Sequence, residues 1–312
     1  MIYTLTPNPS IDRSLTVPEI RFNSVLRSEV VRLDWGGKGF NVSRSLHYLG
    51  IESLALAWVG GGSGKMLADG LQSLGIQTDF VWVDKDTRTN TMIIEKSGDW
   101  HIKVNEPGPT ISQDDIDQLF QKIESNARKD DLWILSGSLP PDVPENFYAE
   151  LIELFKVRGS KVCLDTNGTA LLLGSQAGPY LVKPNAAEAS QIVGFEIKDK
   201  EDAKRAALPF LRMGIEVLGI TMGEVGLLLA TQKEMVFASP PKVHVRNAAG
   251  SGDSLLAGMI YAHLQGMDLL ETARWGVATG TASVETEGVS EFDIARIQAL
   301  LQEVKSEVIN VM

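Results

Sequence analysis

The chain has 312 residues, of which 44% are hydrophobic and 22% charged, and its formal net charge is −11. The composition is ordinary for a globular protein, and the acidic balance argues against nucleic acid as the main partner because phosphate-backbone binding needs a basic surface. A single cysteine excludes a disulfide framework and favours a reducing, cytoplasmic compartment, and no apolar stretch is long enough to span a membrane.

Short β-type runs alternate with helical patterns along the chain, which is typical of βαβ units on a largely parallel sheet. We expect strands at 2–5, 54–59, 80–83, 132–135, 161–165, 180–182 and 217–221, and helices at 39–49, 65–74, 112–125, 145–158, 199–213, 253–265 and 268–285. Two further pairs of β-like segments have no helix between them and predict a small accessory sheet that covers the open end of the main sheet. They are 14–17 with 28–33, and 91–95 with 100–105.

The run Gly60-Gly-Gly-Ser-Gly-Lys65 is rich in glycine but does not fit a phosphate-binding P-loop. The Walker pattern needs Gly five residues before the Gly-Lys pair, where this chain has Val59, and Ser or Thr after the Lys, where it has Met66. We therefore expect this run only to begin a helix.

The run Gly36-Gly-Lys-Gly39 precedes Asn41 and the predicted helix 39–49. Glycines let a backbone approach a ligand closely, and a helix start offers free amides to an anion, to which Lys38 would add a charge. A flexible turn with a solvated lysine explains the same residues equally well. On this motif alone both interpretations stay open.

The run Asn247-Ala-Ala-Gly-Ser-Gly-Asp253 leads directly into an apolar helical pattern. The amides of Gly250, Ser251 and Gly252 could point together into one concavity, which would form an anion hole. Asp253 should stay ionised there, because a helix N-terminus favours negative charge. An ionised carboxylate beside an anion hole suits phosphoryl transfer, in which it would act as the base. A simple helix cap after a glycine turn is the alternative.

Asn185 and Glu188 follow Lys183 and Pro184 at the start of another predicted helix. A spacing of three residues puts both on one helix face, and their oxygens suit Mg²⁺, usually through water. Asn at the cap with Glu three residues later also predicts a capping box, and taken alone this structural interpretation is favoured.

Six motifs in sequence order resemble those of the ribokinase-like sugar kinases, specifically their phosphofructokinase-B (PfkB) branch. They are Thr6-Pro-Asn-Pro-Ser-Ile-Asp12, Gly36-Gly-Lys-Gly-Phe-Asn41, Thr87-Arg-Thr-Asn90, Ser136-Gly-Ser-Leu-Pro140, Val182-Lys-Pro-Asn185 with Glu188, and Gly250-Ser-Gly-Asp253. The resemblance implies one kinase domain over residues 1–312. Its expected fold is α/β, a ribokinase-like three-layer α/β/α sandwich with a mostly parallel central sheet and a small β-sheet lid formed from about 13–34 and 88–106.

The resemblance also implies a role for each matched residue. Asp253 would be the catalytic base, and the anion hole would be formed by Gly250, Ser251 and Gly252. The substrate would be bound by Asp12, Gly37, Lys38, Asn41, Arg88 and Ser138, with Lys38 and Arg88 on the phosphate that it already carries. ATP would be bound by Lys183, Asn185, Thr221, Gly223 and Gly226. Asn185 and Glu188 would hold Mg²⁺ through water, and the backbone carbonyls near 247–249 make K⁺ a further candidate.

Lys38 within Gly-Gly-Lys-Gly is similar to the 1-phosphofructokinase and tagatose-6-phosphate kinase sub-branch. We therefore expect ATP-dependent phosphorylation of a ketohexose monophosphate to its bisphosphate, with fructose 1-phosphate as the first candidate. Tagatose 6-phosphate and fructose 6-phosphate are the alternative substrates, and a non-catalytic sugar-phosphate sensor is the alternative class. The resemblance also implies a homodimer that pairs through the lid, and we expect no nucleic-acid or membrane partner.

Overall fold

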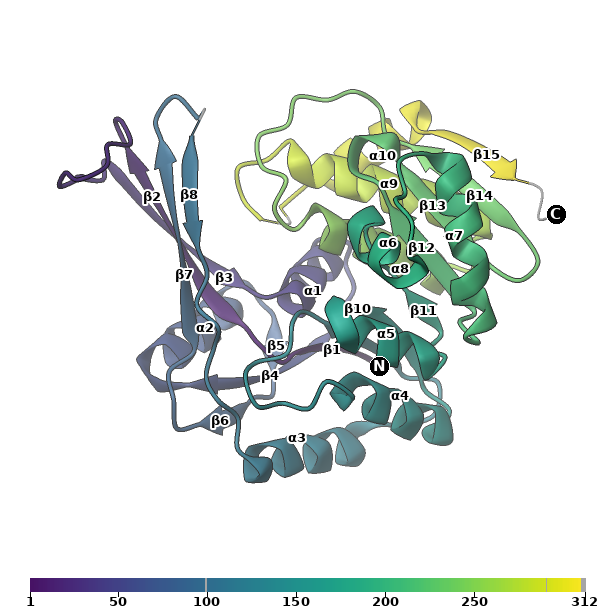
Figure 1. Cartoon of the computed structure of the whole chain (residues 1–312), viewed down its shortest axis with the longest axis horizontal. Coiled ribbons are helices and arrows are strands. Elements are labelled where there is room, and N and C mark those ends of the chain that lie inside the picture. The colour runs from purple at the N-terminus through teal and green to yellow at the C-terminus, as the bar shows by residue number, and fades with distance from the viewer. Residues whose placement is uncertain (99, 290, 310–312) are drawn as a thin grey trace.

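A computed structural model describes residues 1–98, 100–289 and 291–309, and its centre is a large, mostly parallel sheet. The strand order is β15-β14-β13-β12-β11-β10-β9-β1-β4-β5, and β6 also pairs with β4. The strands are β1 (Ile2–Thr6), β4 (Leu54–Gly60), β5 (Gln77–Thr78), β6 (Val81–Val83), β9 (Leu132–Ser136), β10 (Lys161–Asp165), β11 (Leu181–Val182), β12 (Val217–Thr221), β13 (Leu227–Ala230), β14 (Met235–Ser239) and β15 (Lys305–Ile309). Figure 1 shows β15 at the end of the sheet, next to the C-terminus.

Helices cover both faces of this sheet. Both faces carry apolar side chains, because successive residues of a strand point to opposite sides. In β9, Leu132 and Ile134 pack into one hydrophobic cluster, whereas Trp133 and Leu135 pack into the other. The first face is covered by α1 (Lys38–Tyr48), α2 (Gly61–Ser73), α8 (Ser251–Leu264), α9 (Leu269–Val284) and α10 (Ile294–Glu303). The second face is covered by α3 (Gln113–Asn126), α4 (Phe147–Arg158), α5 (Gly168–Gln176), α6 (Ala186–Val193) and α7 (Lys200–Arg212). No helix in the described ranges has the length and apolar character needed to cross a membrane.

A second, four-stranded sheet projects from one side of the molecule (Figure 1). Its strands are β2 (Ser10–Val17), β3 (Val30–Gly36), β7 (Arg88–Glu95) and β8 (His101–Val104), in the order β3-β2-β7-β8. The central pair β2 and β7 is parallel, and both outer pairs are antiparallel. Since β2 starts only a few residues after β1 ends, the first residues of β2 lie where the two sheets meet.

The three-layer sandwich with a small accessory sheet confirms the expected fold class. Several elements were not expected from the sequence, namely α5, α10, β5, β13, β14 and β15. The strands β13 and β14 form an antiparallel hairpin at one end of the sheet, with continuous apolar runs that show no alternation. The helix expected from Lys65 begins earlier, at Gly61, because the tertiary environment overrides the low helix propensity of glycine.

Candidate active site

The candidate site lies where the parallel strands of the main sheet end. Ser136, Asp165 and Thr221 are the last residues of β9, β10 and β12. Lys183 follows β11 and lies against the start of α8, since a side chain at Gly252 would begin 3.5 Å from Lys183 Nζ. The carboxyl ends of parallel strands are where α/β folds usually bind their ligands.

The start of α8 presents backbone amides and a buried carboxylate to this edge. Gly250 caps the helix with a φ of 75°, a left-handed conformation that favours glycine. Ser251, Gly252 and Asp253 form the first turn, whose amides have no partner within the helix, and the Ser251 amide donates a 3.3 Å hydrogen bond to the carbonyl of Ala248 just before it. The Asp253 side chain is buried, and its Oδ2 accepts a 2.8 Å hydrogen bond from Nδ2 of Asn41 in α1. The fold therefore places Asn41 beside the residues expected to form the anion hole and the base.

Two lysines share one buried carboxylate near Asp253. Lys38 Nζ lies 2.7 Å from Asp165 Oδ1, and Lys183 Nζ lies 2.9 Å from Asp165 Oδ2. Burial alone would raise the pKa of Asp165, but Lys183 and Lys38 outweigh that effect and hold the pKa below its usual value. Asp165 therefore stays a carboxylate and fixes both ammonium groups at the edge of the sheet.

The surroundings of Asp253 shift its pKa in the opposite direction from that of Asp165. Burial and, next, the negative charge of Asp165 raise the pKa of Asp253 from 3.8 to about 6. The loss of hydration thus outweighs the helix dipole, which by itself favours the ionised form. At neutral pH the group is a carboxylate whose pKa is close to the working pH, which suits a residue that accepts a proton.

The Asp12 carboxylate lies at the junction of the two sheets. Its Oδ1 accepts hydrogen bonds of 2.8 Å from Ser10 Oγ and from Asn90 Nδ2. A side chain at Gly36 would begin only 2.4 Å from Asp12 Oδ2, so this close approach requires glycine. Gly37 follows with a φ of 144°, which also favours glycine, and turns the chain into α1.

Arg88 begins β7, where it lies opposite Ser10 in the parallel register. Its two terminal nitrogens donate to the carbonyls of Glu106 and Asn8, each at 3.0 Å. Its Nε is buried and has no partner among the described residues. Burial lowers the pKa of the Arg88 guanidinium, but this group stays charged at any physiological pH.

Buried polar atoms that lack a partner are frequent around this edge. In the described part of the chain they include Thr6 Oγ1, Asn8 Oδ1, Asn41 Oδ1, Asn90 Oδ1 and Ser136 Oγ. Buried polar groups are normally hydrogen-bonded, so several such atoms at the ends of neighbouring elements indicate a site for a polar ligand.

Comparison with known proteins identifies the class to which this site belongs. The chain matches the pfkB family of carbohydrate kinases over residues 8–295. It belongs to this family. It is 35% identical over 307 residues to the 1-phosphofructokinase of Bacillus subtilis, a match that covers 98% of this chain and 99% of that protein. It is 30% identical over 304 residues to the 1-phosphofructokinase of Vibrio cholerae, covering 97% and 96%.

Solved structures agree with this family assignment. The crystal structure of phosphofructokinase-2 from Escherichia coli in complex with potassium has a TM-score of 0.91 to this pfkB protein at 28% identity, and the match covers 97% of this chain and 98% of that one. The expected family is thus confirmed, and the chain is an ATP-dependent sugar kinase.

Asn185 and Glu188 form the capping box that the sequence predicts. Asn185 Oδ1 accepts a 2.8 Å hydrogen bond from the Glu188 amide, and the Asn185 amide donates at 2.9 Å to Glu188 Oε2. Glu188 is only half-buried, and its charge is among those that raise the pKa of Lys38 above its usual value against the effect of burial. The cap therefore leaves Glu188 close to the charged groups of the site, with a second carboxylate oxygen outside the cap.

The remaining predicted residues lie on loops at the same edge. Ser138 is half-buried in the loop that follows β9, and Thr221 ends β12. Gly223 and Gly226 come next, with positive φ values of 54° and 136°. A side chain at Gly226 would collide with the carbonyl oxygen of Ala238 at 2.3 Å, so packing alone requires this glycine.

Two residues of the site were not predicted, Asp165 and Asn90. Asp165 ends the apolar run Lys161-Val-Cys-Leu-Asp165, and a lone carboxylate at the carboxyl end of a buried strand is a signal that could have identified it. Asn90 belongs to a matched motif, but its bond to Asp12 depends on the parallel pairing of β2 with β7, which no local pattern reveals.

Proposed function

We propose that this kinase transfers the terminal phosphoryl group of ATP to fructose 1-phosphate and forms fructose 1,6-bisphosphate. The observation that carries the proposal is a buried, titratable Asp253 beside the first-turn amides of α8 and two lysines held by Asp165. The relatives from Bacillus subtilis and Vibrio cholerae, both named 1-phosphofructokinase, support this choice of substrate.

In the proposed step, Asp253 accepts the proton of the C6 hydroxyl group of the sugar. The C6 oxygen forms a bond to the terminal phosphorus of ATP, and the bond from that phosphorus to the bridging oxygen breaks, so that ADP leaves. The first-turn amides of α8, from Gly250 to Gly252, would stabilise the negative charge on the transferring group. Lys38 and Lys183 would add two positive charges close to this turn, because Asp165 fixes them there.

We assign the phosphate that the sugar already carries chiefly to Arg88. Its unpaired, buried Nε and its planar guanidinium fit a phosphate group. Lys38 contacts Asp165 and interacts with Asp253, so its charge would serve the transferring phosphoryl group as well as the substrate phosphate. The sugar hydroxyl groups would bind Asp12, Gly37 and Asn41, with Ser138 nearby.

The nucleotide and its cations would lie next to Lys183. Thr221, Gly223 and Gly226 would line the nucleotide site there. Asn185 and Glu188 would hold Mg²⁺ through water, since Glu188 has an oxygen outside its capping box and oxygen ligands suit this ion. When bound, Mg²⁺ would neutralise charge on the ATP phosphates.

The carbonyls of residues 247–249, just before α8, would suit K⁺. One of the similar structures is a potassium complex of Escherichia coli phosphofructokinase-2, which supports testing this ion. Turnover measured in KCl against choline chloride at equal ionic strength would show whether K⁺ is required.

We further propose that residues 1–312 form one kinase domain whose β-lid closes over the sugar and pairs with a second copy. Val30, Val31 and Leu33 in β3 are 56%, 52% and 40% exposed, which leaves apolar surface for such a partner. A Leu33→Lys variant should shift the sedimentation coefficient from dimer to monomer.

The reaction is tested by following ADP release with ATP, Mg²⁺ and K⁺ against fructose 1-phosphate, tagatose 6-phosphate, fructose 6-phosphate, fructose and ribose. We expect fructose 1-phosphate to have the highest kcat/KM. Asp253→Asn should still bind substrates and lose about 10²–10⁴-fold in kcat, the usual contribution of a general base. Asp69→Asn, at an exposed position of α2, is the matched control.

Each outcome has a distinct meaning. A preference for tagatose 6-phosphate or fructose 6-phosphate would keep the reaction and change the substrate. Turnover restricted to neutral sugars would contradict the assignment of Arg88. Binding of sugar phosphates without any ADP release would establish the non-catalytic sensor instead, and normal turnover of Asp253→Asn would refute the base.

A further inference from the structure

A buried asparagine lies in the short link between the main sheet and the four-stranded sheet. The link joins β1 to β2 and consists of Pro7, Asn8 and Pro9. Asn8 is only 5% exposed, although connecting segments usually run over the surface. Its backbone is restricted on both sides, because a proline has a fixed φ and holds the residue before it in the extended region.

Arg88 is held by two backbone carbonyls that belong to separate segments. Its Nη2 donates to the Asn8 carbonyl and its Nη1 to the Glu106 carbonyl, each at 3.0 Å. Glu106 belongs to the segment 105–112, which Figure 1 shows running from the end of β8 to α3. Asn8 and Glu106 each precede a proline, so both carbonyls sit on a restricted backbone. The guanidinium therefore has two rigid acceptors.

The Asn8 side chain joins these two segments to each other. Its Nδ2 donates a 3.0 Å hydrogen bond to the Pro107 carbonyl. Gly108 has a φ of 101°, and a side chain there would begin 2.2 Å from Asn8 Oδ1, so this close approach requires glycine. Arg88, Asn8 and the backbone of 106–107 thus form a closed ring of hydrogen bonds.

This ring leaves donors of Arg88 available to a ligand. The Nε atom is buried and has no partner in the part of the chain that the structure describes. Each terminal nitrogen carries a second N–H as well. A guanidinium whose position is already fixed loses little freedom when a phosphate binds, so this preorganisation increases the affinity without adding a contact.

We infer that Asn8 is a positioning residue for the phosphate that the sugar already carries. It acts through Arg88, whose guanidinium it fixes by joining the link between the sheets to the segment 106–108. The inference rests on the proposed role of Arg88 in binding this phosphate. It holds for whichever ketohexose phosphate the kinase prefers.

The kinetic test measures ADP release by Asn8→Ala, which lacks the hydrogen bond to Pro107. We expect KM for the sugar phosphate to rise about 3–10-fold, the equivalent of one neutral hydrogen bond, while kcat and KM for ATP change less than about twofold. Gly108→Ala should have the same effect, because its added methyl group displaces the Asn8 side chain from the opposite direction.

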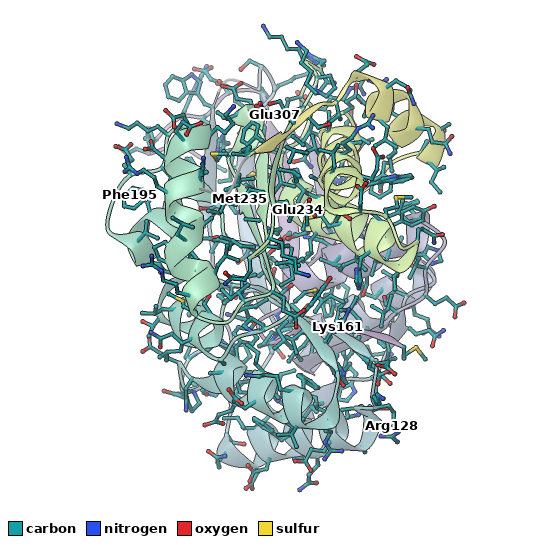
Figure 2. The ribbon with its side chains drawn as sticks, turned by 90° about the vertical axis from the view of Figure 1, so that its right-hand side faces the viewer. Arg128, Lys161, Phe195, Glu234, Met235 and Glu307 are labelled. Carbon is teal, nitrogen blue, oxygen red and sulfur yellow. The ribbon has the colours of Figure 1, made fainter. Side chains whose placement is uncertain are left out.

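Asn126→Ala is the matched control. Asn126 Nδ2 also donates to a backbone carbonyl, that of Lys122 at 2.9 Å. Asn126 lies two residues before Arg128, which Figure 2 shows on the side of the molecule turned away from the four-stranded sheet. This variant should leave every kinetic constant unchanged.

A double-mutant cycle separates positioning from a direct contact between Asn8 and the sugar. If Asn8 acts through Arg88, Asn8→Ala has no further effect on KM in a chain that already carries Arg88→Gln. An equal rise of KM in both backgrounds, or a fall in kcat at constant KM, would overturn the inference.

The Nε–H signal of Arg88 in a ¹H–¹⁵N spectrum tests the positioning without any substrate. Its absence from the spectrum of Arg88→Gln assigns it. We expect Asn8→Ala and Gly108→Ala to speed its hydrogen exchange, because the guanidinium becomes mobile, and Asn126→Ala to have no effect. Unchanged exchange in the first two variants would overturn the inference. Faster exchange together with an unchanged KM in Arg88→Gln would instead refute the proposed phosphate contact of Arg88 and support only the fixing of its guanidinium by Asn8.

Discussion

Replacing Asp253 with Asn should make this kinase more stable at neutral pH in the same step that removes its turnover. The native carboxylate is buried, and its pKa is raised from 3.8 to about 6. The folded protein therefore binds a proton at Asp253 more tightly than the unfolded chain does. Ionisation of this group consequently opposes folding above pH 6, and the penalty disappears as the pH falls through 6 toward 3.8.

The size of this penalty follows from the two pKa values. Each tenfold difference in proton affinity corresponds to about 1.4 kcal/mol, so the ionised carboxylate costs about 3 kcal/mol of unfolding free energy at pH 7.5. The same linkage gives about half of that penalty at pH 5, where the folded protein is mostly protonated and the unfolded chain mostly ionised. An asparagine carries no charge at either pH and can still accept the hydrogen bond from Asn41.

The assay is urea unfolding of the native chain and of Asp253→Asn, without ligands, at pH 7.5 and pH 5. We expect the variant to be more stable by about 3 kcal/mol at the higher pH and by about half as much at the lower one. A ¹³C-carboxyl NMR titration, with the variant to assign the signal, would measure the pKa of Asp253 directly. An advantage that does not change with pH, a less stable variant, or a carboxyl that titrates near 4 would refute the reasoning.

Three other predictions address the neighbouring residues. Arg88→Gln should raise KM for fructose 1-phosphate about 10–100-fold in the ADP-release assay, because a charged contact to the bound phosphate is lost. The kcat should stay nearly unchanged. A large fall in kcat at constant KM would contradict this role. Gly36→Ala should displace the Asp12 carboxylate and raise KM for the sugar phosphate, whereas Gly62→Ala, where a side chain meets open space, should not. Asp165→Asn should lower the free energy of unfolding at pH 7 by about 3 kcal/mol in urea, since it leaves the buried Lys183 and the partly exposed Lys38 without their partner. An unchanged midpoint would show that the pairs are not structural.

Most of the fold could be predicted because its signals are local. The helix α1 follows a glycine turn, and α9 and α7 have clear capping residues and apolar spacing, so their expected bounds agree with the structure within a few residues. The hairpin β13–β14 was missed for a physical reason. Its strands are buried on both faces, so their apolar runs lack the alternation that distinguishes a strand from a short buried helix.

The individual residues of the candidate site could be predicted from the sequence, but the charge interactions between them could not. The glycine turn before Asp253 indicates both the proposed anion hole and the proposed base. The ion pairs of Asp165, by contrast, join β10 to a lysine at the start of α1 and another after β11, which are far apart in the chain. The raised pKa of Asp253 depends on burial and on that same Asp165, so no motif could have indicated it.

The ligand-free site balances its own charges, which explains how a chain with a net charge of −11 can bind two anionic substrates. The buried Asp165 and Asp253 lie in one cluster with the buried Lys183 and the partly exposed Lys38, so neither lysine is unpaired before substrates arrive. The acidic exterior acts weakly on this cluster, because salt screens exposed charges beyond about 8–10 Å. Phosphate groups that enter would share the two ammonium groups with Asp165 and would also gain the amides of α8. The extra negative charge would in turn raise the proton affinity of Asp253 at the moment when it must accept a proton, so the same contacts that bind the phosphates would strengthen the base.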